Sequence, residues 1–264
     1  MLSYVRGEQE GRLLPIERVA QSPGYYDADV ERDLSQLVEG PTTPLLDALR
    51  HGETLDETGR TAVAVYAATC IKRVPRAREQ GRELIPHTLE AVVERLRTEL
   101  PELSGGDPVR MDKLRNDLEV AYEKYRETPP TAVLDQLRDP RPTWAMVEAI
   151  RNMSWRLLIT EPPEMFLTSD NPLFYFEGLG FGKDTSEFAF PLSPTRCLHG
   201  CRQPLRLGGT LETRNAERAL VHEINRRMAN NATKLLFANA KVKFPITLLR
   251  KGRGHYLSRI NWTY

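Results

Sequence analysis

Four polar or turn-forming residues interrupt an apolar run in the stretch FLTSDNPLFYF. Ser169, Asp170, Asn171 and Pro172 follow one short strand-like run and precede another. A carboxylate and a hydroxyl at the ends of adjacent strands can project into a pocket, where Asp170 would act as a general base or bind a metal. The same residues are typical of a plain turn, because short polar side chains accept backbone N–H bonds and proline keeps the preceding residue extended. The sequence leaves both interpretations open.

A second set of chemically useful side chains lies on an expected helix further along the chain. His222, Asn225 and Arg226 are separated by three and four residues, so they can share one helix face. An Asn–Arg pair suits an anionic group such as phosphate or carboxylate. The structural alternative is that these residues bind the backbone of a neighbouring loop, including the Asp170 turn. The run HEIN lacks the second histidine of a His-Glu-x-x-His zinc motif.

Cys197, His199 and Cys201 alternate, so on a strand they would face the same side, a geometry that a metal could use. The spacing matches no known zinc knuckle, and small buried cysteines on a core face account for it. We therefore predict no metal site. The sequence identifies no cofactor.

Two basic stretches could contact nucleic acid phosphates, but neither has the interleaved aromatic residues of a base-stacking surface. They comprise Arg73, Arg76, Arg78 and Arg82 in the first half and Arg250, Lys251, Arg253, His255 and Arg259 near the end. Solvated faces explain both. The glycine-rich phosphate loop, the dinucleotide-binding turn and the Gly-x-Ser-x-Gly elbow are all absent.

The bulk composition indicates an ordinary globular protein. Lys and Arg number 37 against 36 Asp and Glu, so the net charge of +1 creates no global field that would draw in nucleic acid or a membrane. Three scattered cysteines are too few for a disulfide framework. The chain shows neither a signal peptide nor a run of apolar residues long enough to cross a bilayer. We expect a cytoplasmic protein with no membrane association.

The order of periodic segments predicts an α+β fold in a single domain, residues 1–264. A mainly helical layer over about 29–153 should include helices at 56–73 and about 107–127, and a helix broken around Gly81 and Pro86. A strand-rich part over about 154–264 should carry one long helix at about 212–240 and a last strand pair at 244–251 and 255–260. The helical layer is expected to pack on a mixed or antiparallel sheet formed by an N-terminal hairpin and this second half.

Several ordered segments carry a resemblance to a known family. They are RTAVAVYAATCIKRVPRARE, WRLLITEPPEMFLTSDNPLFYF, EFAFPLSPTRCLHG and VHEINRRMANNATKLLFANA. Together they resemble the bacterial family catalogued as domain of unknown function 4238, whose pattern includes a Thr-Ser-Asp-x-Pro turn, a Pro-Leu-Ser-Pro segment and a helix with an Asn. These correspond here to residues 168–172, residues 191–194 and Asn225. Members usually begin with a His-x-x-Pro-x-x-Tyr-Leu segment, which precedes the first residue of this sequence.

Two functional hypotheses follow from these residues. In the first, the protein is a hydrolase acting on nucleic acid or a nucleotide. Asp170 would then be the base or a metal ligand, Ser169 and Asn225 would orient the reacting groups, and Asn171, His222 and Arg226 would hold an anionic ligand. In the second, it is a non-enzymatic binding or regulatory module whose partner is nucleic acid or an anionic small molecule.

Overall fold

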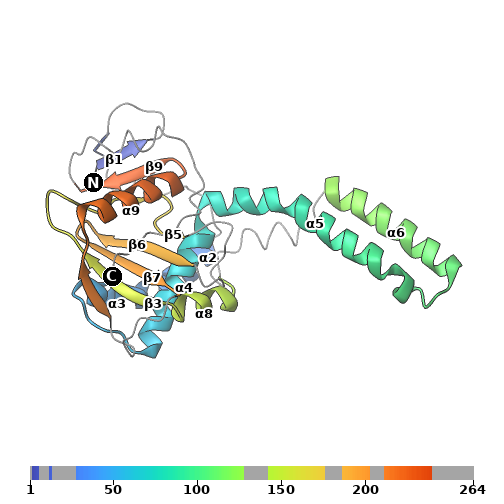
Figure 1. Cartoon of the computed structure of the whole chain (residues 1–264), viewed down its shortest axis with the longest axis horizontal. Helices are drawn as coiled ribbons and strands as arrows, with labels where there is room; N and C mark the ends of the chain where they lie inside the picture. Colours follow the sequence, from blue (N-terminus) through green and yellow to red (C-terminus); the bar gives the residue numbers. More distant parts are fainter. Residues whose placement is uncertain are drawn as a thin grey trace. The chain divides into compact units, whose positions relative to one another are not determined.

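The structure, a computed structural model, describes residues 2–5, 12–13, 28–127, 142–175, 186–202 and 211–239. The chain forms two compact units, one of Met1–Val74 with Arg141–Tyr264 and the other of Pro75–Pro140 (Figure 1). The α+β class is confirmed, because the first unit combines helices with a four-stranded and a five-stranded sheet. The helical range expected at 29–153 is divided between the two units.

The larger sheet of the first unit has the strand order β5-β6-β7-β3-β8. Its members are β3 (Ser154–Ile159), β5 (Phe174–Tyr175), β6 (Glu187–Ser193), β7 (Arg196–Cys201) and β8 (Glu212–Asn215). Strands β3 and β8 pair in parallel, and the other pairs are antiparallel. The sheet is therefore mixed, but the N-terminal hairpin, which we expected to join it, belongs to the other sheet.

Three helices pack on one face of this sheet: α3 (Gly40–Arg50), α4 (Glu57–Arg73) and α8 (Trp144–Arg151). Successive residues of a strand point to opposite faces, so Trp155 and Leu157 meet these helices while Arg156 and Leu158 lie on the other face. Helix α4 begins where its sequence predicts, because the Asp56 carboxylate accepts a hydrogen bond from the Gly59 N–H at 2.7 Å.

The opposite face packs against α9 (Arg218–Asn231) and residues of the second sheet. That sheet has the order β2-β1-β9-β4, from β2 (Arg12–Leu13), β1 (Leu2–Val5), β9 (Leu235–Ala238) and β4 (Thr168–Ser169). Figure 1 shows α9 lying between β9 and β6. Ile224 and Met228 of α9 are completely buried and share a core with Tyr4 of β1 and Leu158 of β3. Helix α9 therefore joins the two sheets.

The prediction of one long helix at about 212–240 is wrong. Residues Glu212–Asn215 form β8, α9 occupies only Arg218–Asn231, and Leu235–Ala238 form β9. Residues 212–215 are all polar and pair with β3 as β8, and β9 pairs with both β1 and β4. Backbone pairing in two different sheets overrides the apparent helical period.

Helices α2 (Ala28–Asp33) and α3 are joined by a π-helical turn at Leu34–Glu39. Pro44 lies inside α3. The segment 128–141, the final strand pair and the second basic stretch fall outside the described residues, as do the side chains of Arg76, Arg78 and Arg82.

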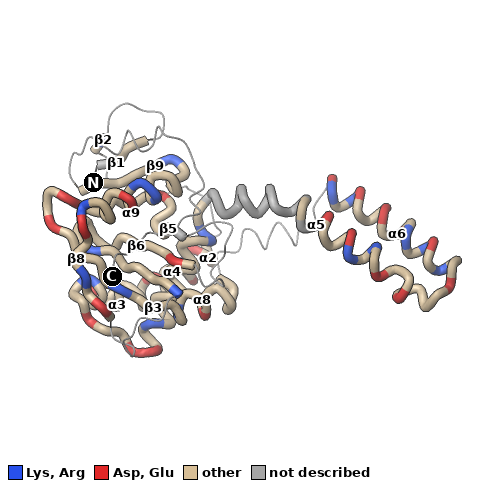
Figure 2. Tube along the Cα trace, in the orientation of Figure 1, with Lys and Arg blue, Asp and Glu red and all other residues tan. Residues whose placement is uncertain are grey.

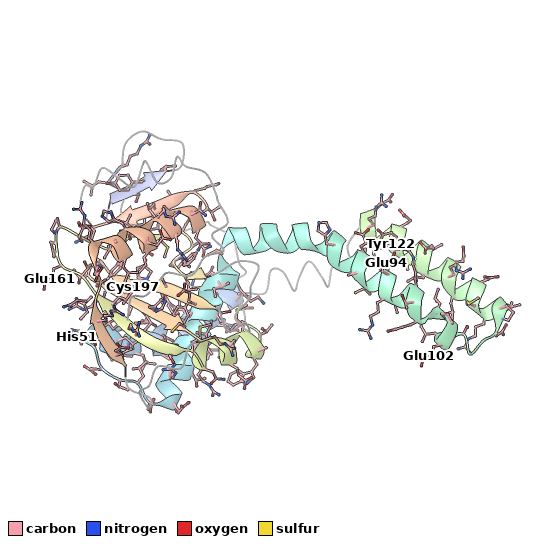
Figure 3. All side chains as sticks on the ribbon, in the orientation of Figure 1. His51, Glu94, Glu102, Tyr122, Glu161 and Cys197 are labelled. Atoms are coloured by element: carbon pink, nitrogen blue, oxygen red, sulfur yellow. The ribbon has the colours of Figure 1, made fainter. Side chains whose placement is uncertain are left out.

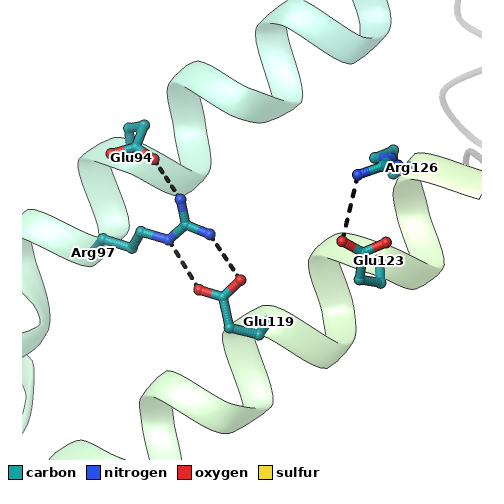
Figure 4. A network of polar contacts seen from close by, with 5 residues as sticks. All are labelled: Glu94, Arg97, Glu119, Glu123 and Arg126. Atoms are coloured by element: carbon teal, nitrogen blue, oxygen red, sulfur yellow. Dashed lines mark hydrogen bonds and ion pairs between the residues drawn. The ribbon is translucent and has the colours of Figure 1, made fainter.

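The second unit contains two long helices, α5 (Pro75–Leu103) and α6 (Pro108–Glu127). Helix α5 runs through Gly81 and Pro86, so the expected break is wrong, since a proline removes one backbone donor without necessarily ending a helix. An ion pair joins the two helices: the Arg97 guanidinium donates to both carboxylate oxygens of Glu119 at 2.9 and 2.7 Å (Figure 4). No helix among the described residues is long and apolar enough to cross a membrane.

We predict that Gly200→Ala destabilises the first unit. Gly200 lies between Phe188 and Trp155 in the strand register, and an added Cβ would overlap the Phe188 ring, which packs edge-on against Trp155. The expected loss in the free energy of unfolding is about 1–3 kcal/mol, measured by chemical denaturation. Combining Gly200→Ala with Phe188→Leu should cost less than the sum of the single changes; strict additivity would contradict this packing.

Candidate functional site

The Ser169–Pro172 turn carries the chain from one sheet to the other, because β4 belongs to the four-stranded sheet and β5 to the five-stranded sheet. The Ser169 hydroxyl accepts from the Asn171 N–H at 3.1 Å and donates to the Asn171 carbonyl at 2.7 Å. These local bonds fix the reversal, and Pro172 restricts Asn171 to an extended backbone. The sequence therefore places the turn correctly between two strands.

The Asp170 carboxylate binds three consecutive backbone amides at the end of α9. Its Oδ1 accepts from the Thr233 N–H at 2.8 Å, and its Oδ2 accepts from the N–H groups of Lys234 and Leu235 at 2.7 and 3.1 Å. In return, the Asp170 N–H donates to the Leu235 carbonyl at 3.1 Å. Both carboxylate oxygens thus hold the connection between α9 and β9.

The Asn225 side chain also binds backbone groups, in the part of the chain that precedes the Ser169–Pro172 turn. It is completely buried, its Oδ1 accepts from the Leu167 N–H at 2.8 Å, and its Nδ2 donates to the Met165 carbonyl at 2.7 Å. The side-chain amide therefore satisfies a backbone donor and a backbone acceptor that would otherwise be buried without partners. This is the alternative in which a helix residue binds the backbone of a neighbouring loop.

Further contacts continue along α9, so that residues 164–173, here called the docked segment, follow the helix over most of its length. The Ser169 hydroxyl lies 3.4 Å from the Met228 sulfur. The Asn231 side chain donates to the Leu173 carbonyl at 2.9 Å, and the Asn171 side chain donates to the Asn231 carbonyl at 3.4 Å. Asn231 was missed from the sequence; the available signal was that Asn225, Met228 and Asn231 follow one another at three-residue steps.

His222 and Arg226 lie on the outer side of α9, away from the buried Asn225. The His222 Nε2 is 2.9 Å from a Glu164 carboxylate oxygen, and the Arg218 Nε is 3.0 Å from the other. Arg226 pairs with Glu223 of its own helix at 2.6 Å. The structure thus separates His222 and Arg226, which are accessible to a ligand, from Asn225.

Cys197, labelled in Figure 3, and His199 alternate along β7 and lie on the α9 face of the sheet, as their spacing predicts. Burial raises the pKa of the Cys197 thiol, so it stays protonated at neutral pH and packs as a small apolar group. Among the residues that the structure describes, no three His, Cys, Asp or Glu side chains are placed to share a metal ion.

A row of ionisable side chains, most of them buried, crosses the same face and was missed from the sequence. The strand register places Arg156 of β3 beside His199 of β7 on one side and beside Glu212 of β8 on the other. The Arg156 Nε lies 2.9 Å from a Glu212 oxygen, and the His199 Nε2 lies 3.2 Å from a Glu187 oxygen. Single charges inside the apolar strands SWRLLI and EFAFPLS were the only signal in the sequence.

The environment keeps His199 neutral. Burial lowers the pKa of His199 below its ordinary value; the Glu187 carboxylate opposes this, and the positive charges of Arg156 and Arg227 lower it further. Arg227 is itself buried on α9, where its Nε donates to Glu223 at 2.6 Å and its guanidinium lies over the Phe174 ring. A neutral imidazole held by a carboxylate beside two guanidinium groups can accept a proton near bound negative charge.

Comparison with known proteins identifies a family for this chain, but that family has no described activity. A family model described as "Protein of unknown function (DUF4238)" matches residues 1–242. No curated protein and no solved structure gives a significant match.

We predict that Asp170→Ala lowers the free energy of unfolding by about 1–3 kcal/mol, because three backbone amides lose their acceptor. Asp170→Asn should recover little of this, since an amide nitrogen would face backbone donors. The exposed His222→Ala is the matched control and should change stability by about 0.5 kcal/mol or less. Urea denaturation measures all three. An Asp170→Ala variant as stable as the parent would contradict the scaffold role.

We also predict a pH effect from His199. Its pKa is lower in the folded chain than the 6.5 of the unfolded chain, so only the unfolded state takes up the proton as the pH first falls below 6.5. Stability from this group is therefore complete above pH 6.5 and declines as the pH falls. In His199→Asn, the melting temperature should fall less steeply between neutral and mildly acidic pH. Parallel curves for parent and variant would exclude a buried neutral His199.

Proposed function

Given that the chain belongs to the family "Protein of unknown function (DUF4238)", we propose that it is a non-enzymatic binding or regulatory module. The observation that carries this proposal is the engagement of Asp170 with three backbone N–H groups. A general base must reach the proton that it removes, within about 2.6–3.2 Å or through one water. Both oxygens of this carboxylate are already at that distance from the backbone of residues 233–235.

Asn225 supports the same proposal. A residue that orients a substrate needs an amide atom directed toward that substrate, and here both ends of the amide bind the docked segment. The side chains that the sequence marks for catalysis thus position the backbone, which is the behaviour of a scaffold.

The partner would be nucleic acid or an anionic small molecule, bound on the outer side of α9. Arg218, His222 and Arg226 follow one another at four-residue steps there, and their side chains are 76%, 45% and 36% exposed. A phosphate or carboxylate would compete with Glu164 and Glu223 for these groups. The three free cysteines are consistent with a reducing compartment, and we place the module in the cytoplasm.

A hydrolase acting on nucleic acid or a nucleotide is the second candidate, and one observation favours it. His199 and Glu187 form a buried pair near Arg156 and Arg227, and such groups are the usual parts of proton transfer beside an anionic substrate. In this version His199 would replace Asp170 as the base.

The two candidates are separated by a turnover and binding experiment on the full chain. The proposed module should leave DNA, RNA, nucleotides and aryl phosphoesters uncleaved with Mg²⁺ or Mn²⁺ present. A labelled oligonucleotide or a nucleotide should bind, and Arg226→Ala or His222→Ala should each weaken binding by about two- to fivefold at low salt. Ala219→Ser, on the same helix, is the control and should bind as the parent does.

Turnover would overturn the proposal. Cleavage that is lost in His199→Asn but kept in Arg226→Ala, with both variants folded by circular dichroism, would establish the hydrolase with His199 as its base. Cleavage that is lost in a folded Asp170→Asn variant would instead assign the role of base or metal ligand to Asp170. Binding that is unchanged in Arg226→Ala and His222→Ala would remove the outer side of α9 as the anion site.

A further inference from the structure

The Glu164 carboxylate of the docked segment is bound by two side chains of α9, one at each oxygen. Its Oε1 lies 3.0 Å from the Arg218 Nε, and its Oε2 lies 2.9 Å from the His222 Nε2. A carboxylate only accepts hydrogen bonds, so both nitrogens must donate. Arg218 and His222 are four residues apart, which places them on one face of α9. Together they hold an anion that presents two oxygens.

This geometry suits a phosphate group as well as a carboxylate. Both kinds of oxygen accept charge-assisted hydrogen bonds from such donors, and a phosphate also offers two oxygens side by side. Arg218 and His222 belong to the outer side of α9, where the proposed function places the anionic partner. Glu164 therefore occupies the position that one phosphate of that partner would take.

Glu223, the other carboxylate on the outer side of α9, has a different relation to its partners. It pairs with Arg226 and Arg227 of its own helix, at three- and four-residue steps, so all three stay together wherever the helix lies. Glu164 belongs to a separate segment, 58 residues before His222. Figure 2 shows both basic and acidic residues along α9. Of these two carboxylates, Glu164 is the one that can leave its partners without any change in the helix.

The Glu164 side chain can turn away while the backbone of the docked segment stays in place. The next residue is held independently, because the Met165 carbonyl accepts from the Asn225 Nδ2 at 2.7 Å. Arg218 and His222 are exposed, and ion pairs with exposed side chains contribute little to stability. Displacement of Glu164 by an incoming anion therefore leaves the fold intact.

We propose that Glu164 is an autoinhibitory contact: its carboxylate takes the place of a phosphate group on the outer side of α9, and a phosphate-bearing ligand must displace it to bind. This inference rests on the proposed function, because it requires that the outer side of α9 binds an anion. It adds the chemical group that is recognised, a phosphate with two accessible oxygens. It also adds a regulation, since the chain carries its own competitor for that group.

The test is a fluorescence-anisotropy titration of the full chain with a labelled single-stranded oligonucleotide and with a labelled nucleoside triphosphate. Glu164→Gln should tighten binding by about two- to fivefold at low salt, because a neutral amide competes poorly for Arg218 and His222. A gain with both probes would show that a nucleotide phosphate suffices, and a gain with the oligonucleotide alone would assign the site to a nucleic acid strand.

The matched control is Glu161→Gln, which removes the same charge from an exposed residue three positions earlier, labelled in Figure 3. None of the ion pairs between described residues includes Glu161, so this variant should bind as the parent does. In an Arg218→Ala background, Glu164→Gln should give a smaller gain than in the parent, because one of its two contacts is already lost.

A stability measurement separates inhibition from a purely structural role. The melting temperature of Glu164→Gln should stay within about 2 °C of the parent, because the ion pair is exposed. A fall of more than about 5 °C without any gain in binding would show that Glu164 fastens the docked segment, and this would overturn the proposal.

The remaining outcomes distinguish this inference from the proposed function. A parent that binds and a Glu164→Gln variant that binds equally well would overturn the autoinhibitory contact and leave the proposed function in place. Equal gains in Glu164→Gln and Glu161→Gln would show a general charge effect and would overturn it too. If neither the parent nor Glu164→Gln binds either probe, the proposed function fails and this inference fails with it.

Discussion

The fold of the first unit depends on one interaction: side chains of α9 supply hydrogen bonds to the docked segment, a stretch of backbone that crosses between the two sheets. The docked segment leaves one sheet and enters the other, and along this path only residues 168–169 and 174–175 pair in a sheet. Unpaired buried backbone is costly, so α9 provides the missing partners through Asn225 and Asn231, while Asp170 serves the end of the helix in return. The helix and the segment therefore order each other.

This mutual arrangement explains why residues suited to catalysis are buried in a scaffold. Asparagine and aspartate are the short side chains that imitate a peptide group, and a site that must satisfy backbone uses the same chemistry as one that must bind a substrate. The charged row differs, because its side chains bind side chains of neighbouring strands: Arg156 pairs with Glu212, and His199 pairs with Glu187. Buried charge of this kind is costly and rarely needed for stability, so it marks the more distinctive chemistry in the fold.

The sequence predicts those elements whose signals are local. Helices α4 and α6 begin within a residue of the expected positions, with Asp56 and Asp107 accepting hydrogen bonds from the backbone of the first turn, and the SDNP turn lies between two strands. The prediction for residues 212–240 fails because only pairing with distant strands reveals β8 and β9. The charged row also cannot be recognised from the sequence, because only the pairing register of β3, β6 and β7 brings its members together. Roles that depend on sequence-distant neighbours could not be predicted.

The Asp170 interaction also has a consequence for how related sequences should vary. Its partners are peptide N–H groups, which every residue type except proline supplies, so this interaction constrains position 170 but not the side-chain identities at positions 233–235. Comparison of relatives would then find a solitary fixed acid without any covarying partner. That pattern is commonly attributed to an active site. Here a carboxylate that binds only backbone amides would produce it for a structural reason.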